Sequence, residues 1–121
     1  MYPAVLIVDD EPDILRLNRY ILESKQYSVL EAGNGQEAVN LFELNSDELE
    51  LVVLDLTMPV MDGMDTFEHI KKIKPEIKVL LVTGYDDMWD LDSMVEQENI
   101  EILKKPYQID DFMNVIGKIM N

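Results

Sequence analysis

Residues 51–63 read LVVLDLTMPVMDG, an apolar run that ends in an aspartate and leads into a segment with proline and glycine. A short, unbroken apolar run of this kind is typical of a strand that is buried on both faces of a parallel sheet. A carboxylate at the end of such a strand is costly to bury unless it is paired or bound to a metal ion. The position of Asp55 therefore indicates a functional group held at the carboxyl end of a rigid strand.

The same pattern of apolar runs and amphipathic segments repeats along the whole chain. Strands are expected at residues 4–8, 27–32, 50–55, 78–83 and 100–104. Helices are expected at residues 12–25, 36–44, 64–74, 87–97 and 109–120. Consecutive strand–helix units with apolar strands predict an α/β fold, a (βα)5 chain with a five-stranded parallel sheet that is doubly wound and flavodoxin-like, in strand order 2-1-3-4-5.

Helical periodicity also predicts which side chains face the core. Pro12 suits the first turn of the first helix, and the residues expected on the inner face of that helix are Ile14, Leu17, Ile21 and Leu22. The only histidine, His69, lies on a polar helix face, so simple exposure is favoured over a role as a phosphorylated residue or metal ligand.

Composition limits the classes of protein that fit. A chain of 121 residues can bury one core, and we expect a single domain over residues 1–121. The absence of cysteine excludes disulfides and thiolate zinc sites, and the apolar runs are too short to cross a bilayer, which favours a cytoplasmic protein with no membrane contact. A formal net charge of -15 disfavours direct binding to nucleic acid but fits a basic or metal-bearing partner.

Charged and polar side chains gather where the predicted strands end. Doubly wound sheets bind ligands beyond the carboxyl ends of their strands, at the point where strand order reverses, which here lies between the first and third strands. Asp9 and Asp10 follow the first strand and Asp55 ends the third. Thr83 ends the fourth strand, and Lys105 follows the fifth. We therefore expect three acids, a hydroxyl and an ammonium at one edge of the sheet.

This set of groups suits phosphoryl chemistry on a metal ion. Neighbouring carboxylates raise one another's pKa unless a cation lies among them, and oxygen ligands of this kind suit Mg²⁺ or Mn²⁺. With the metal bound, Lys105 and the Thr83 hydroxyl could bind phosphate oxygens. Asp55 is then the expected nucleophile, because carboxylates form aspartyl phosphates.

Four motifs in order resemble those of response-regulator receiver domains of two-component signalling, over essentially the whole chain. They are VDDEP (8–12), LDLTMPVMDG (54–63), VTG (82–84) and KKPY (104–107). The resemblance implies that Asp55 accepts a phosphoryl group from a sensor histidine kinase or a phosphotransfer protein. It further implies that Mg²⁺ is ligated by Asp10, Asp55 and the Thr57 backbone carbonyl, with Asp9 in the same acidic pocket.

The resemblance also implies how the signal leaves the site. Thr83 would be the switch hydroxyl, and Lys105, before a cis peptide to Pro106, would contact the phosphoryl group. Phosphorylation would shift the fourth helix, the fifth strand and the fifth helix, with Gly84 in the same switch region. Ile102 stands where these domains usually carry tyrosine or phenylalanine, so the usual threonine–aromatic switch is put in question.

Residues around the switch define three further expectations. Thr57 and Tyr85 occupy positions that influence loss of the phosphoryl group in this family. Only one of two successive strand lysines can face the site, and the Lys-Pro pairing selects Lys105. The candidate partner surface comprises Trp89, Asp90, Lys104 and Tyr107.

Other functions remain as alternatives. A phosphatase of the haloacid-dehalogenase type also uses an aspartyl nucleophile, but it needs a second aspartate two residues later, where this chain has Thr57. A flavin carrier needs a phosphate-binding loop after the first strand, where VDDEP would repel phosphate. The output partner, an attached output domain, and the choice between a monomer and a phosphorylation-dependent dimer are left open.

Overall fold

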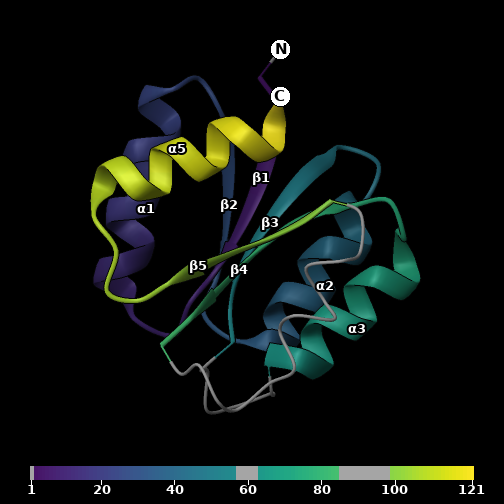
Figure 1. Ribbon diagram of the computed structural model, residues 1–121. Helices are drawn as coiled ribbons and strands as arrows, with labels where there is room; N and C mark the ends of the chain where they lie inside the picture. The colour runs from purple at the N-terminus through teal and green to yellow at the C-terminus, as the bar shows by residue number, and fades with distance from the viewer. Residues whose placement is uncertain (1, 57–62, 85–98) are drawn as a thin grey trace.

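The computed structural model describes residues 2–56, 63–84 and 99–121 (Figure 1). Five parallel strands form one sheet in the order β2-β1-β3-β4-β5, which confirms the predicted topology. The strands are β1 (Ala4–Val8), β2 (Ser28–Ala32), β3 (Leu49–Asp55), β4 (Lys78–Thr83) and β5 (Ile100–Lys104). The described helices are α1 (Pro12–Ser24), α2 (Gly35–Asn45), α3 (Gly63–Ile73) and α5 (Ile109–Met120). The helix expected at residues 87–97 lies outside the described residues.

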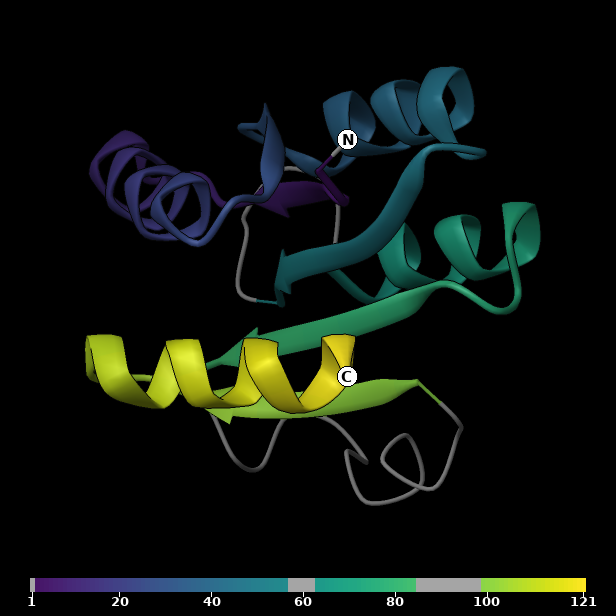
Figure 2. The ribbon, with the colours of Figure 1, turned by 90° about the horizontal axis from the view of Figure 1, so that it is seen from above.

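The described helices cover both faces of the sheet. α1 and α5 lie on one face, and α2 and α3 lie on the other (Figures 1 and 2). Alternate residues of β1 belong to different cores: Val5 and Ile7 pack on the side of α1 and α5, and Leu6 and Val8 pack on the side of α2 and α3. Both faces are buried, which explains why the strands are apolar without alternation.

Local sequence explains where the helices begin. Pro12 occupies the first turn of α1, where its missing N–H costs no hydrogen bond. The Asn34 side chain caps α2 by accepting a hydrogen bond from the Glu37 N–H at 2.9 Å. Gln108 and Asp111 form a capping box at the start of α5. None of the described helices is long and apolar enough to cross a membrane.

The predicted inner face of α1 is wrong in one respect. Leu17 is 44% exposed, whereas Leu15 and Asn18 are buried together with Ile21 and Leu22. The buried stripe is therefore rotated relative to the expected one, and it includes a polar side chain. Asn18 is tolerated there because it has a hydrogen-bond partner, the Tyr107 hydroxyl.

The start of α3 lies directly against the end of β3. A Cβ atom at Gly63 would lie 2.6 Å from the Leu56 Cα and 3.0 Å from the Asp55 carbonyl oxygen. Both neighbours are backbone atoms, which cannot rotate away. Glycine is thus required at this position because the helix and the strand approach too closely for a side chain.

We predict that Gly63→Ala lowers the free energy of unfolding by about 1–3 kcal/mol, because the added methyl group overpacks a backbone contact. Gly117→Ala is the matched control, since a Cβ there meets nothing within 4 Å and Gly117 lies inside α5. That control should raise stability by roughly 0.5–1 kcal/mol through helix propensity. Urea unfolding of the two variants measures both effects. Equal stability of Gly63→Ala and the parent chain would contradict the prediction.

Candidate functional site

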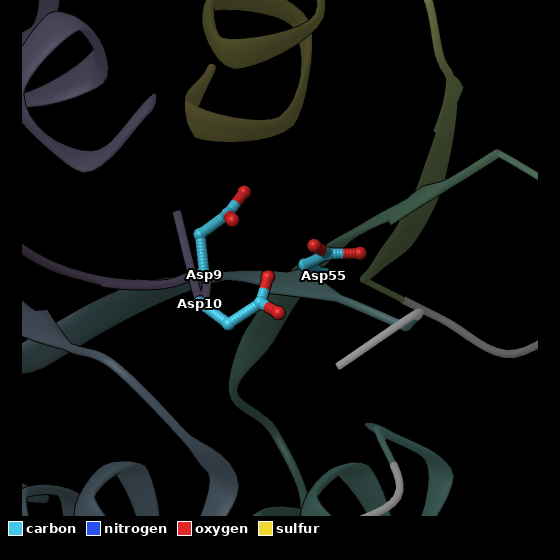
Figure 3. A group of neighbouring side chains, drawn as sticks. All are labelled: Asp9, Asp10 and Asp55. Carbon is cyan, nitrogen blue, oxygen red and sulfur yellow. The ribbon is translucent and has the colours of Figure 1, made fainter. Parts of the chain in front are cut away.

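Three carboxylates meet at the carboxyl ends of the two central strands. Asp9 and Asp10 follow β1, Asp55 ends β3, and the ladder pairs Val8 with Leu54, so the strands end side by side. One oxygen from each carboxylate lies within 4.8 Å of the other two (Figure 3). Asp9 and Asp55 are buried, and Asp10 is exposed. The convergence expected from the motifs is therefore present in the fold.

The ammonium of Lys105 lies among these acids. Its Nζ atom donates a hydrogen bond to Asp55 Oδ2 at 3.1 Å and lies 3.8 Å from Asp9 Oδ2. The Lys105 backbone N–H donates to the Thr83 carbonyl at 2.7 Å, which fixes the chain as it leaves β5. Lys104 is paired with Thr83 in the β4–β5 ladder and is exposed. Lys105 is thus the lysine that contacts the acidic group.

Burial and charge shift the pKa of Asp9. Burial is the largest cause and raises the pKa of this carboxyl to about 6, from 3.8. A hydrogen bond from the Glu11 N–H at 2.9 Å and the nearby Lys105 act in the opposite direction. The charges of Asp55 and Asp10 raise the pKa further. Ionisation of Asp9 therefore costs more free energy in the folded protein than in the unfolded chain.

The pKa of Lys105 moves upward. Burial alone lowers the pKa of this ammonium, but the hydrogen bond to Asp55 and the charges of Asp55 and Asp9 outweigh that effect. The lysine therefore remains charged at neutral pH. Among the described residues, three carboxylates face this ammonium, so they carry an excess of negative charge that a divalent cation with a preference for oxygen ligands could balance.

The remaining predicted residues are distributed around this centre. Thr83 is fully buried at the end of β4, and Gly84 follows it in an exposed position. Ile102 is partly buried on β5 and packs against the core beneath α2 and α3. The peptide between Lys105 and Pro106 is cis. Four predicted positions lie outside the described residues: Thr57, Tyr85, Trp89 and Asp90.

Tyr107 is less exposed than its place in the expected partner surface suggests. Its ring stacks on Phe112 with a centroid distance of 5.7 Å and an interplanar angle of 17°. Its hydroxyl accepts a hydrogen bond from Asn18 Nδ2 at 3.3 Å. The sequence interpretation missed Asn18. Its burial could have been inferred from helical spacing, because Asn18 lies three residues after Leu15 and four before Leu22, on the same face of α1.

The response regulator receiver domain family matches residues 5–117 of the chain. The protein belongs to this family. The fold, the strand order and the carboxylates at the ends of β1 and β3 agree with that assignment. Receiver domains are regulatory modules of two-component signalling.

Known receiver-containing proteins resemble the chain over nearly all of its length. The transcriptional regulatory protein GlrR of Escherichia coli K12 is 35% identical over 112 residues, which are 93% of this chain and 25% of GlrR. The chain thus spans about a quarter of that relative. A receiver domain protein from Clostridium thermocellum has a TM-score of 0.85 with 33% identity, covering 98% of this chain and 94% of that one. The response regulator TrrA of Thermotoga maritima, solved in complex with Mg²⁺-BeF, has a TM-score of 0.81 with 30% identity, covering 98% and 99% of the two chains.

The raised pKa of Asp9 predicts a specific dependence of stability on pH in the absence of divalent cations. Because folding raises this pKa to about 6, the native state binds the proton more tightly than the unfolded chain does. Below about pH 4 both states are protonated and Asp9 costs nothing, whereas the cost grows as pH rises and is complete above pH 6. This cost reaches about 3 kcal/mol, because folding raises the pKa from 3.8 to about 6.

Urea unfolding of the parent chain and of Asp9→Asn, from pH 4 to pH 7 with a chelator present, tests this dependence. The parent chain should lose stability relative to Asp9→Asn as pH rises through this window. A stability difference that stays constant over the window would show that Asp9 ionises without penalty.

Proposed function

We propose that this receiver domain accepts a phosphoryl group on Asp55 in a reaction that requires Mg²⁺ or Mn²⁺. The donor would be a sensor histidine kinase or a histidine phosphotransfer protein in the cytoplasm. One observation carries the proposal: the Asp55 carboxylate is held at a strand end within 4.8 Å of two other carboxylates and 3.1 Å from the Lys105 ammonium. Such an arrangement supplies a nucleophile together with ligands for a metal ion and a cation for phosphate.

The donor set fits a hard divalent cation. Asp10 and Asp55 would ligate the metal directly, Asp9 would act through a water molecule, and the Thr57 backbone carbonyl would complete the protein ligands. When bound, the metal would supply positive charge that neutralises the phosphoryl oxygens and lets them approach three carboxylates. The complex of TrrA with Mg²⁺-BeF supports this assignment, because that relative is 30% identical to the chain.

The chain's own groups would perform the transfer. A carboxylate oxygen of Asp55 attacks the phosphorus of a phosphohistidine, and the new O–P bond forms as the N–P bond breaks. The electron pair of the broken bond goes to the imidazole nitrogen of the donor. Lys105 would contact the transferred phosphoryl group, a role supported by the hydrogen bond that its ammonium donates to Asp55 Oδ2. The Thr83 hydroxyl would bind a second phosphoryl oxygen.

The output would be a change in conformational populations. A phosphoryl group shifts an equilibrium only by binding one conformation better than another, and here it would favour the one in which Thr83 and Lys105 both contact it. Ile102 packs against the core on the α2 and α3 side. Its aliphatic side chain, in place of an aromatic ring, would make the response of β5 differ from the usual threonine–aromatic switch. The fourth helix, β5 and α5 would carry this signal to a partner protein or an attached output domain, from a monomer or a phosphorylation-dependent dimer.

We predict that incubation with acetyl phosphate and Mg²⁺ adds one phosphoryl group, measured as intact mass, and that Asp55→Asn abolishes the gain. The product should be labile to hydroxylamine, as an acyl phosphate is. Asp47→Asn is the matched control, because Asp47 is an exposed aspartate in the turn before β3. This control should be phosphorylated like the parent chain. If the parent chain gained no mass from acetyl phosphate or from a panel of histidine kinases, the proposed function would be wrong.

We further predict that Lys105→Ala slows this phosphorylation by about 10–100-fold, the loss of one hydrogen bond from a charged donor. Lys104→Ala serves as the control, because this substitution removes the same positive charge from the adjacent, exposed position. Intact-mass measurements on samples quenched at successive times, at saturating Mg²⁺, give the phosphorylation rates of both variants. Similar slowing in the two variants would assign the effect to net charge instead of to the Lys105 contact.

A further inference from the structure

A buried polar pair lies behind the acidic site, on the side of α1 and α5. Asn18 is 6% exposed on α1, and its Nδ2 donates to the Tyr107 hydroxyl, which belongs to the segment between β5 and α5. The two residues are separated by 89 positions in the chain. Burying an asparagine in an apolar helix face is costly unless it is hydrogen-bonded. The pair is therefore a specific polar link between two elements that meet only through the fold.

This pair and the two buried acids, Asp9 and Asp55, line the same small cavity. Its polar lining residues are Asp9, Asp55, Asn18 and Tyr107, and the rest of its lining is apolar: Ile7, Val8, Leu15, Val53 and Val82. The cavity measures about 10 Å³, which is room for roughly one water molecule. A buried water needs two to four polar partners, and this wall supplies them. Figure 3 shows the Asp9 side chain pointing toward the side on which α1 and α5 lie.

The hydrogen bond from Asn18 fixes the orientation of the Tyr107 hydroxyl group. Because its oxygen accepts a hydrogen bond from Asn18, its own proton is directed to another acceptor. The ring is fixed by its stacking on Phe112, so the hydroxyl remains at the wall of the cavity. The carboxylates are the strongest acceptors that line this space. Burial also raises the pKa of Tyr107, so the hydroxyl keeps its proton.

We propose that Tyr107 and Asn18 are positioning residues of the phosphoryl site, with the Tyr107 hydroxyl donating a hydrogen bond to one water molecule in this cavity that in turn donates to Asp9. The Asp9 carboxylate is then held on its buried side as well as by the Glu11 N–H at 2.9 Å on Oδ1. This inference rests on the proposed function, since the orientation of Asp9 matters most when the acidic group binds a metal ion. It gives the tyrosine of the KKPY motif a role inside the site.

The consequence is a defined effect on metal affinity. Residues that orient metal ligands without touching the metal typically change affinity by about 10–100-fold when they are lost. Tyr107→Phe keeps the stacked ring and removes only the hydroxyl. Asn18→Leu keeps the side-chain size and removes the donor that fixes the hydroxyl. If both act through one water, the double variant loses no more affinity than the worse single variant.

Two measurements on the full chain test the proposal. Calorimetric titration with MgCl₂ should show affinity lowered about tenfold in Tyr107→Phe and in Asn18→Leu. Tyr20→Phe is the matched control, because Tyr20 is exposed on the outer side of α1, and it should bind Mg²⁺ like the parent chain. Crystal structures of the metal-free parent and Tyr107→Phe should show one ordered water between the Tyr107 hydroxyl and Asp9 in the parent, and none at that point in the variant.

Different failures have different meanings. Equal Mg²⁺ affinity in the parent and in Tyr107→Phe, even with a lower melting temperature in the variant, would reduce the pair to a structural link and overturn the proposal. A cavity without water density in the metal-free parent would overturn it as well. A parent chain that bound no Mg²⁺ would contradict the proposed function, and the crystallographic comparison would then decide the water-mediated link by itself.

Discussion

The parallel pairing of β1 with β3 at the centre of the sheet is the constraint on which the rest of the site depends. Pairing of Val8 with Leu54 places Asp9 and Asp10 beside Asp55, although these residues are 45 positions apart or more. Neither strand can shift by one residue without turning its apolar side chains to the wrong core, because alternate residues of each belong to different faces. The relative positions of the acids are thus fixed by the hydrophobic packing of the two strands that carry them.

Electrostatic repulsion remains among the carboxylates of Asp9, Asp10 and Asp55. In a chain with a net charge of -15, the Lys105 ammonium lies 3.1 Å from the buried Asp55 carboxylate and 3.8 Å from the buried Asp9 carboxylate. The balance is incomplete, as the raised pKa of Asp9 indicates. Negative charge is therefore left that a bound cation would neutralise, and a cation that binds the folded state would stabilise the fold.

Most of the fold follows from local patterns, and much of the site follows from the order of motifs. Unbroken runs such as residues 4–8 and 78–83 reveal buried parallel strands because few other elements are apolar on both faces. Strand-end positions place Asp55 and Lys105 at one edge because the ends of parallel strands coincide. Both features follow from the hydrophobic pattern of the strands and from the sheet topology, and neither depends on how the side chains pack.

The features that were not predicted depend on contacts between distant segments. The inner face of α1 was misassigned because leucine and isoleucine occur on more than one side of that helix, and tertiary packing selected Leu15 over Leu17. A buried Asn18 could not be recognised without its partner in the segment after β5. The need for glycine at position 63 comes from the approach of two backbones, which no composition rule contains.

The contact at Gly63 has a mechanical meaning. Layers of side chains between two elements yield by changing rotamers, so small movements on one side fade before they reach the other. Between the end of β3 and the start of α3 there is no such cushion, since backbone meets backbone. A displacement of the Leu56 backbone would therefore be transmitted directly to the start of α3. α3 is in this sense the helix most directly coupled to the strand that carries Asp55.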